Sequence, residues 1–155
     1  MSNFLSVSMA KWEDVKAIRA SLSGSEVLFD TISFDYMTIT IYADFEKELN
    51  SLIMKKLSEN EFSTNYANFI KIRFKQLHGG LNGDNFKNLV RDVFSGTISV
   101  TDRDWEIYSA FIKFRNSISH DDAYETAKGT LMSNVKSFDD ILGILIKYLN
   151  ALEKI

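Results

Sequence analysis

A chain of 155 residues suits one domain with a substantial core, and a content of 45% hydrophobic and 25% charged residues is typical of a globular protein. A net charge of −3 argues against broad, nonspecific binding of nucleic acid, although basic residues can still gather on one face. The absence of cysteine excludes disulfides, thiolate metal sites and cysteine nucleophiles, and two histidines are too few for a histidine-rich metal site.

The sequence contains neither an apolar run of membrane-spanning length nor a basic-then-apolar signal pattern. We therefore expect a cytoplasmic protein with no membrane contact. The chain has no proline and only seven glycines, which favours long helices joined by short connections.

The first predicted helix covers residues 9–22, with Ser8 as its N-cap, and the sequence Ser-Gly-Ser-Glu at 23–26 ends it. Its apolar positions follow helical spacing at Trp12, Val15, Ile18 and Leu22.

A long helix is predicted for residues 30–57, although "MTITIYADF" within it also alternates as a strand does. One row of this helix contains Ile32, Tyr36, Ile39, Ala43, Glu46 and Ile53, and another contains Met37, Ile41, Phe45, Leu49 and Leu52. A helix that is apolar on two sides is expected at the centre of a bundle.

The next helix is predicted to begin at a capping box formed by Ser58 and Glu61 and to end at Gly79 and Gly80. A short helix follows at 84–94. Its inward positions are Phe86, Leu89, Val90 and Val93.

The stretch 120–136 is polar and is predicted to be irregular, with one helical turn or more. Ser137 and Asp140 cap a final helix. Its apolar positions are Ile141, Leu145, Tyr148, Leu149 and Leu152. The fold class is therefore all-α, a bundle of five or six helices in one domain over residues 1–155.

The helix that begins at Thr101 or Asp102 and runs to about residue 119 carries the candidate site. Arg115 continues its apolar row of Trp105, Tyr108 and Ile112, and a buried guanidinium is costly unless it meets an anion. His120 lies about 140° further around an ideal helix, so it reaches Arg115 only if the helix ends near Ser119. The second apolar row consists of Ile107, Phe111, Phe114 and Ile118.

An arginine and a histidine at this spacing suit the cleavage of RNA by its own 2′-hydroxyl. Histidine moves protons near neutral pH, and a guanidinium grips a phosphate that gains negative charge. No metal or cofactor is required, and the amide of Asn116 can orient either group. The pattern is weak by itself because Arg73 and His78 have the same spacing, and a structural role for either pair stays open.

"RNSISH" at 115–120 resembles the motif of HEPN ribonuclease domains, and further stretches resemble the RiboL-PSP group of that superfamily. These stretches are "TITIYADFEKELNSLI" at 38–53, "FIKIRFKQL" at 69–77 and "GDNFKNLVRDVF" at 83–94. The likeness covers roughly residues 30 to 155 in the same order. Residues 1–29 match nothing in that group, so the role of their helix is open. Asp121 stands where glycine is frequent.

The resemblance implies an all-helical, metal-independent endoribonuclease that forms a homodimer, with the two motifs facing one another in a composite site. Such proteins act as toxins of toxin–antitoxin modules or in phage defence, so an antitoxin or defence-system partner is expected beside the RNA substrate.

By position in the motif, Arg115 would hold the scissile phosphate, His120 would be the general base or acid, and Asn116 would orient them. Glu46 matches the acid of the group's helix and is expected to pair with a basic residue such as Arg115. Arg73 is a candidate RNA contact. The alternatives are a non-catalytic HEPN-like module that binds RNA or protein, and a plain helical dimerisation domain.

Overall fold

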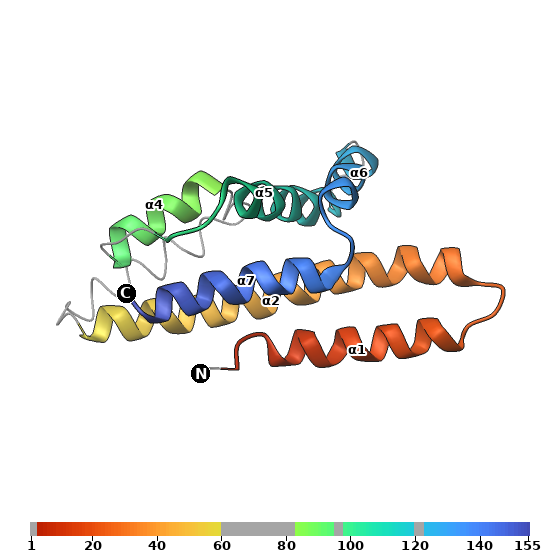
Figure 1. Ribbon diagram of the computed structural model, residues 1–155, viewed down its shortest axis with the longest axis horizontal. Coiled ribbons are helices and arrows are strands. Elements are labelled where there is room, and N and C mark those ends of the chain that lie inside the picture. The colour runs from red at the N-terminus through yellow and green to blue at the C-terminus, as the bar shows by residue number, and fades with distance from the viewer. Residues whose placement is uncertain (1–2, 60–82, 95–97, 120–122) are drawn as a thin grey trace.

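The computed structural model describes residues 3–59, 83–94, 98–119 and 123–155, and the regular structure in these ranges is entirely helical (Figure 1). The prediction of an all-α bundle is therefore confirmed for the described part of the chain. The elements are α1 (Ser6–Ser21), α2 (Glu26–Glu59), α4 (Gly83–Phe94), α5 (Asp102–Ser117), α6 (Tyr124–Asn134) and α7 (Phe138–Glu153).

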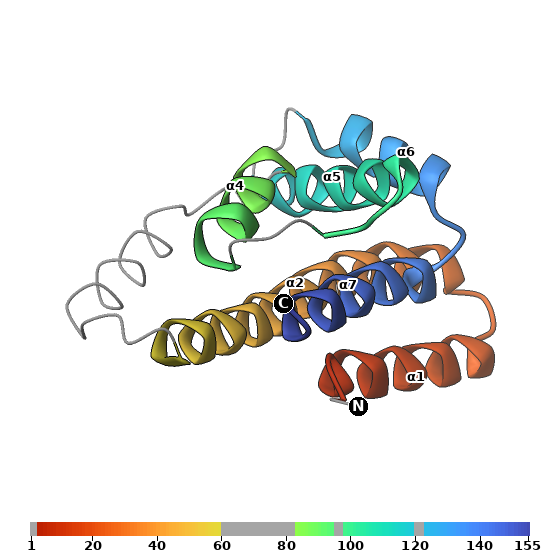
Figure 2. The same ribbon diagram turned by 60° about the vertical axis from the view of Figure 1, so that its left-hand side comes forward.

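The helices form three layers, with α2 and α7 side by side in the middle (Figures 1 and 2). Helix α1 packs against α2 on one side, while α4 and α5 pack against the α2–α7 pair on the other, and α6 packs on α5. The 34 residues of α2 span about 51 Å, enough to contact four other helices. None of the described helices is long and apolar enough to cross a membrane.

The core is centred on five aromatic side chains from four helices. Phe86 of α4 stacks on Tyr148 of α7, with ring centroids 5.6 Å apart and an interplanar angle of 20°. The cluster consists of Phe45, Phe86, Trp105, Tyr108 and Tyr148. The four α4 positions predicted to face inward are all buried, so the 3.6-residue period identified the correct face.

Helix α1 begins at Ser6, so the prediction that Ser8 is its N-cap is wrong. The residue at the cap, Leu5, is left-handed with φ 58° and offers no side-chain acceptor. Both the amide and the hydroxyl of Ser8 donate to Oδ2 of Asp44 in α2, at 3.0 and 2.8 Å. A carboxylate from the neighbouring helix therefore satisfies the first-turn donor that a local cap normally satisfies.

Helix α2 begins at Glu26, earlier than predicted, and only one of its two apolar rows is buried throughout. The row from Met37 to Leu52 is buried as expected, whereas Ile32, Tyr36 and Ile39 of the other row are 60%, 46% and 51% exposed. In the described residues, Lys11 of α1 reaches only the edge of this face, with its ammonium 5.5 Å from the centre of the Tyr36 ring. The strand alternative is excluded, because Thr38 is helical and its buried hydroxyl donates to the carbonyl of Phe34 at 2.8 Å.

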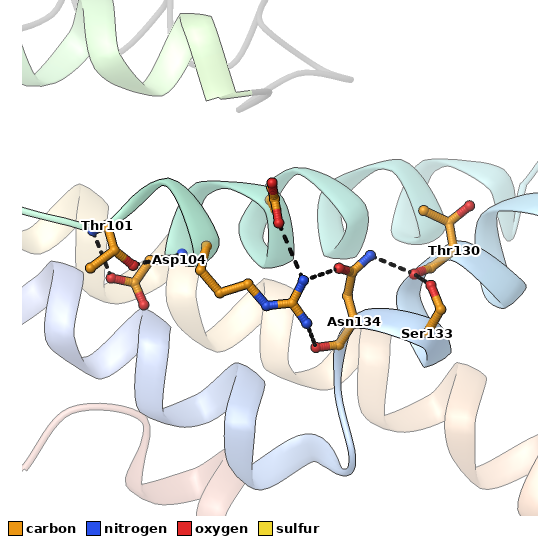
Figure 3. Close-up of polar contacts among 7 residues, drawn as sticks. Thr101, Asp104, Thr130, Ser133 and Asn134 are labelled. Carbon is orange, nitrogen blue, oxygen red and sulfur yellow. Dashed lines mark hydrogen bonds and ion pairs between the residues drawn. The ribbon is translucent and has the colours of Figure 1, made fainter.

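The predicted caps of α5 and α7 are confirmed. Thr101 accepts a hydrogen bond from the amide of Asp104, and the Asp104 carboxylate accepts one from the amide of Thr101, which completes a capping box (Figure 3). The Ser137 hydroxyl accepts from the amide of Asp139, and Asp140 accepts from the amide of Lys136.

The stretch 120–136 was expected to be irregular with one helical turn or more, and residues 124–134 within it form the 11-residue helix α6. The sequence shows no regular apolar row in this helix, because Leu131 is the one residue of α6 that is fully buried. Arg103 of α5 donates to the side-chain oxygen and to the backbone carbonyl of Asn134, in the last turn of α6 (Figure 3). The side-chain amide of Asn134 in turn donates to the backbone carbonyl of Thr130. A cationic donor at a helix C-terminus satisfies an otherwise unpaired carbonyl.

Ser58 lies in the last turn of α2, where its hydroxyl donates to the carbonyl of Lys55 at 2.6 Å. It is therefore not the start of a new helix. Glu61, Gly79, Gly80 and the helix predicted between them lie outside the described residues.

Candidate functional site

Arg115 lies near the C-terminal end of α5, at the point where its core row reaches the surface. Tyr108 and Ile112 of that row are buried, whereas Arg115 is half-buried. Its guanidinium carbon lies 4.3 Å from the centre of the Tyr42 ring, a cation–π contact with α2. Its Nη1 donates to Oδ1 of Asn116 at 3.1 Å. The guanidinium is thus held on a ring and beside an amide.

Tyr42 and Glu46 are one turn apart on α2 and belong to the same group of side chains as Arg115. Burial raises the pKa of Tyr42, the Glu46 carboxylate raises it further, and the Arg115 guanidinium lowers it. The charges of Glu46 and Arg115 therefore both act on the Tyr42 hydroxyl. We call Tyr42, Glu46, Arg115 and Asn116 the Arg115 cluster.

The expected ion pair between Glu46 and Arg115 is absent from the ion pairs of the described residues. The Tyr42 ring takes the place of the carboxylate as the neighbour of the guanidinium. Because a ring face attracts a cation without neutralising it, Arg115 keeps a net positive charge toward a third group.

Tyr42 is a member of this cluster that the sequence did not single out. The signal was its spacing of four residues from Glu46, which places the two side chains on one face of a helix. The sequence pattern did not distinguish this role from that of a core residue, because Tyr42 lies in the buried part of α2 and is only 6% exposed.

Helix α5 ends at Ser117, and the amide of Ile118 still donates to the carbonyl of Phe114 at 3.2 Å. The end of α5 before Ser119 meets the condition under which His120 would turn back toward Arg115. His120 itself lies outside the described residues, as do Arg73 and His78.

The chain returns to α2 at Tyr124, the first residue of α6. Its hydroxyl donates to Oδ1 of Asp35 at 2.7 Å, and its ring lies 5.4 Å from that of Phe114. Burial and the hydrogen bond to Asp35 raise the pKa of Tyr124 above its ordinary value. The described residues on either side of 120–122 therefore follow α5 and precede a tyrosine bonded to α2.

The guanidinium and the amide of the Arg115 cluster suit the binding and orientation of an anionic group. Across the described residues, no three His, Cys, Asp or Glu side chains gather in a way that would hold a metal ion. Compared with protein-family models, with curated proteins and with solved structures, the chain matches none.

Proposed function

We propose that the protein is a metal-independent endoribonuclease of the HEPN type that cleaves RNA through attack by the substrate's own 2′-hydroxyl. The observation that carries the proposal is the placement of the Arg115 guanidinium, half-buried on the Tyr42 ring and bonded to Asn116. A cation held in this way is preorganised for phosphate, because its planar donors are oriented before the anion arrives.

In the proposed reaction the 2′-oxygen attacks phosphorus and the bond to the 5′-oxygen breaks. His120 takes the 2′-hydroxyl proton or supplies one to the leaving 5′-oxygen. Arg115 binds the nonbridging oxygens, on which negative charge grows in the transition state. Asn116 orients the Arg115 guanidinium by accepting a hydrogen bond from it. Glu46 influences the guanidinium indirectly, through the Tyr42 side chain on which both charges act. The products are a 2′,3′-cyclic phosphate and a 5′-hydroxyl.

A homodimer is the proposed working form, and an exposed apolar row on α2 supports it. The exposed α2 row consists of Leu28, Ile32, Tyr36 and Ile39, which are 66%, 60%, 46% and 51% exposed. Ile39 and Glu46 are seven residues apart, so they lie on nearly the same face of the helix, two turns from one another. A second copy seated on this row, with the two-fold axis passing beside Glu46, would bring the two Arg115 clusters together.

Cleavage of cellular RNA is harmful unless it is restrained. We therefore place the protein in a toxin–antitoxin or phage-defence system, with an antitoxin or defence protein as its restraint. This part of the proposal rests on the resemblance of "RNSISH" and the stretches around it.

The decisive experiment incubates purified protein with total cellular RNA in excess EDTA. It compares the wild type with His120→Ala and with His78→Ala. His78 follows Arg73 at the same spacing as His120 follows Arg115, so it is a control within the same chain. We expect cleavage by the wild type and by His78→Ala, none by His120→Ala, and cyclic phosphate ends on the products.

Equal cleavage by wild type and His120→Ala would remove His120 from the mechanism. RNA binding without cleavage by all three proteins would instead support the non-catalytic module. Sedimentation of Ile39→Lys beside Val7→Lys tests the dimer, because both side chains are 51% exposed but Val7 lies on α1. We expect only Ile39→Lys to become monomeric and to lose cleavage.

A further inference from the structure

A cleft of about 430 Å³ lies between α1, the first turns of α2, α6, and the connection from α6 to α7. It is separate from the Arg115 cluster, none of whose four residues lines it. Its volume falls within the range of about 300 to 1,000 Å³ that is usual for small-molecule sites.

The floor of this cleft is aromatic. The rings of Trp12 and Phe138 meet edge to face at 5.2 Å, and Phe34 lies 4.9 Å from Phe138. Two apolar side chains stand exposed at the rim: Val27 at 81% and Met132 at 56%. An apolar body seated in the cleft would remove these side chains from water, which favours binding.

The charges that line the cleft are one-sided, with four cations against one carboxylate. Arg19 is paired with that carboxylate, Asp30, and Lys16 is paired with Glu13 at 2.7 Å. These two cations are therefore largely neutralised within the chain.

The other two cations, Lys128 and Lys136, remain available. The Lys128 ammonium lies 5.7 Å from the Phe34 ring and 5.4 Å from the Tyr124 ring, and donates to the Tyr124 hydroxyl at 3.5 Å. These contacts orient the ammonium without neutralising it. Lys136 is exposed, and its ammonium bonds to no other residue in the described ranges.

We propose that this cleft binds a small amphipathic anion, with an aromatic or aliphatic body on the floor and its acidic group between Lys128 and Lys136. The volume and the aromatic floor select a single small molecule, and the two unneutralised ammonium groups select a negative charge. The proposal does not depend on ribonuclease activity, since it concerns different residues.

The test uses two probes with the same rings: 8-anilinonaphthalene-1-sulfonate, which is an anion, and N-phenyl-1-naphthylamine, which is neutral. Binding is followed by the ¹H–¹⁵N signals of the two indole groups. Trp12 lines this cleft, whereas Trp105 is half-buried and lines a different one, so the Trp105 signal reports whether the probe binds elsewhere. We expect the sulfonate to shift the Trp12 signal saturably and to leave Trp105 unchanged.

The charge requirement is tested with the double variant Lys128→Gln/Lys136→Gln. We expect its dissociation constant for the sulfonate to rise about tenfold, equivalent to about 1.4 kcal/mol for two partly exposed charge contacts. The matched control, Lys47→Gln/Lys154→Gln, removes two exposed lysines outside the cleft and should bind as the wild type does. Equal affinity for the neutral probe, or an unchanged Trp12 signal, would overturn the proposal.

Discussion

Replacement of Asp44 by alanine should destabilise the protein far more than its place on the side of α2 suggests. One carboxylate oxygen of Asp44 accepts both the amide and the hydroxyl of Ser8, whose exposed fraction is 0%. A hydrogen bond to a charged group contributes about 1.5 to 3 kcal/mol. Since the two donors share one oxygen and the hydroxyl can rotate, we expect a loss of about 2 to 4 kcal/mol.

A matched control exists at the other end of the same pair of helices. Asp30 of α2 pairs with Arg19 of α1, but these two side chains are 52% and 42% exposed. An exposed ion pair contributes about 0.2 to 1 kcal/mol, so Asp30→Ala should cost less than about 1 kcal/mol. Asp44→Asn keeps an acceptor oxygen and loses the charge, and should fall between the two alanine variants.

The assay is urea unfolding followed by far-ultraviolet circular dichroism, together with hydrogen exchange at the Ser8 amide. We expect the Asp44→Ala midpoint to fall and the exchange of the Ser8 amide to accelerate, with neither change in Asp30→Ala. Equal urea midpoints for the two alanine variants would refute the reasoning, because they would show that the contact with Ser8 does not hold α1 in place.

Three further outcomes are expected. Phe86→Ala, at 0% exposure in the aromatic cluster, should cost about 3 to 5 kcal/mol in urea unfolding, and a loss below 1 kcal/mol would contradict the packing described. Burial raises the pKa of the Asp104 carboxyl, but hydrogen bonds from Lys147 and Thr101 outweigh it and hold the pKa below 3.8. The ionised carboxylate therefore stabilises the fold above pH 3.8, and this effect disappears as the pH falls through the folded-state pKa. The difference in unfolding free energy between wild type and Asp104→Asn should narrow in acid, and a constant difference would refute this. Arg115→Lys should lower kcat for RNA cleavage about 10²-fold at an unchanged urea midpoint, because lysine keeps the charge without the planar donors, and full activity would exclude the proposed role of the guanidinium.

Only part of the candidate site could be predicted from the sequence. The sequence placed Arg115 near the end of a helix, because it continues the row of core positions that begins at Trp105, and Asn116 is the next residue. It did not identify Tyr42 as the partner of Arg115. The predicted ion pair with Glu46 failed for a physical reason: the distance between two side chains on different helices depends on how those helices cross, which no spacing within either helix encodes.

Local features of the chain determined the helical class, the inward face of α4, and the caps at Thr101 and Ser137. Each depends on residues within one or two turns, where periodicity and hydrogen bonding act directly. The tertiary structure decided the rest. Asp44 of α2 accepts a hydrogen bond from the first-turn amide of Ser8 in α1, and Arg103 of α5 binds the carbonyl of Asn134 at the end of α6. The apolar row from Leu28 to Ile39 of α2 stays exposed. These outcomes depend on which helices become neighbours, because an apolar face is buried only where another element is present to cover it.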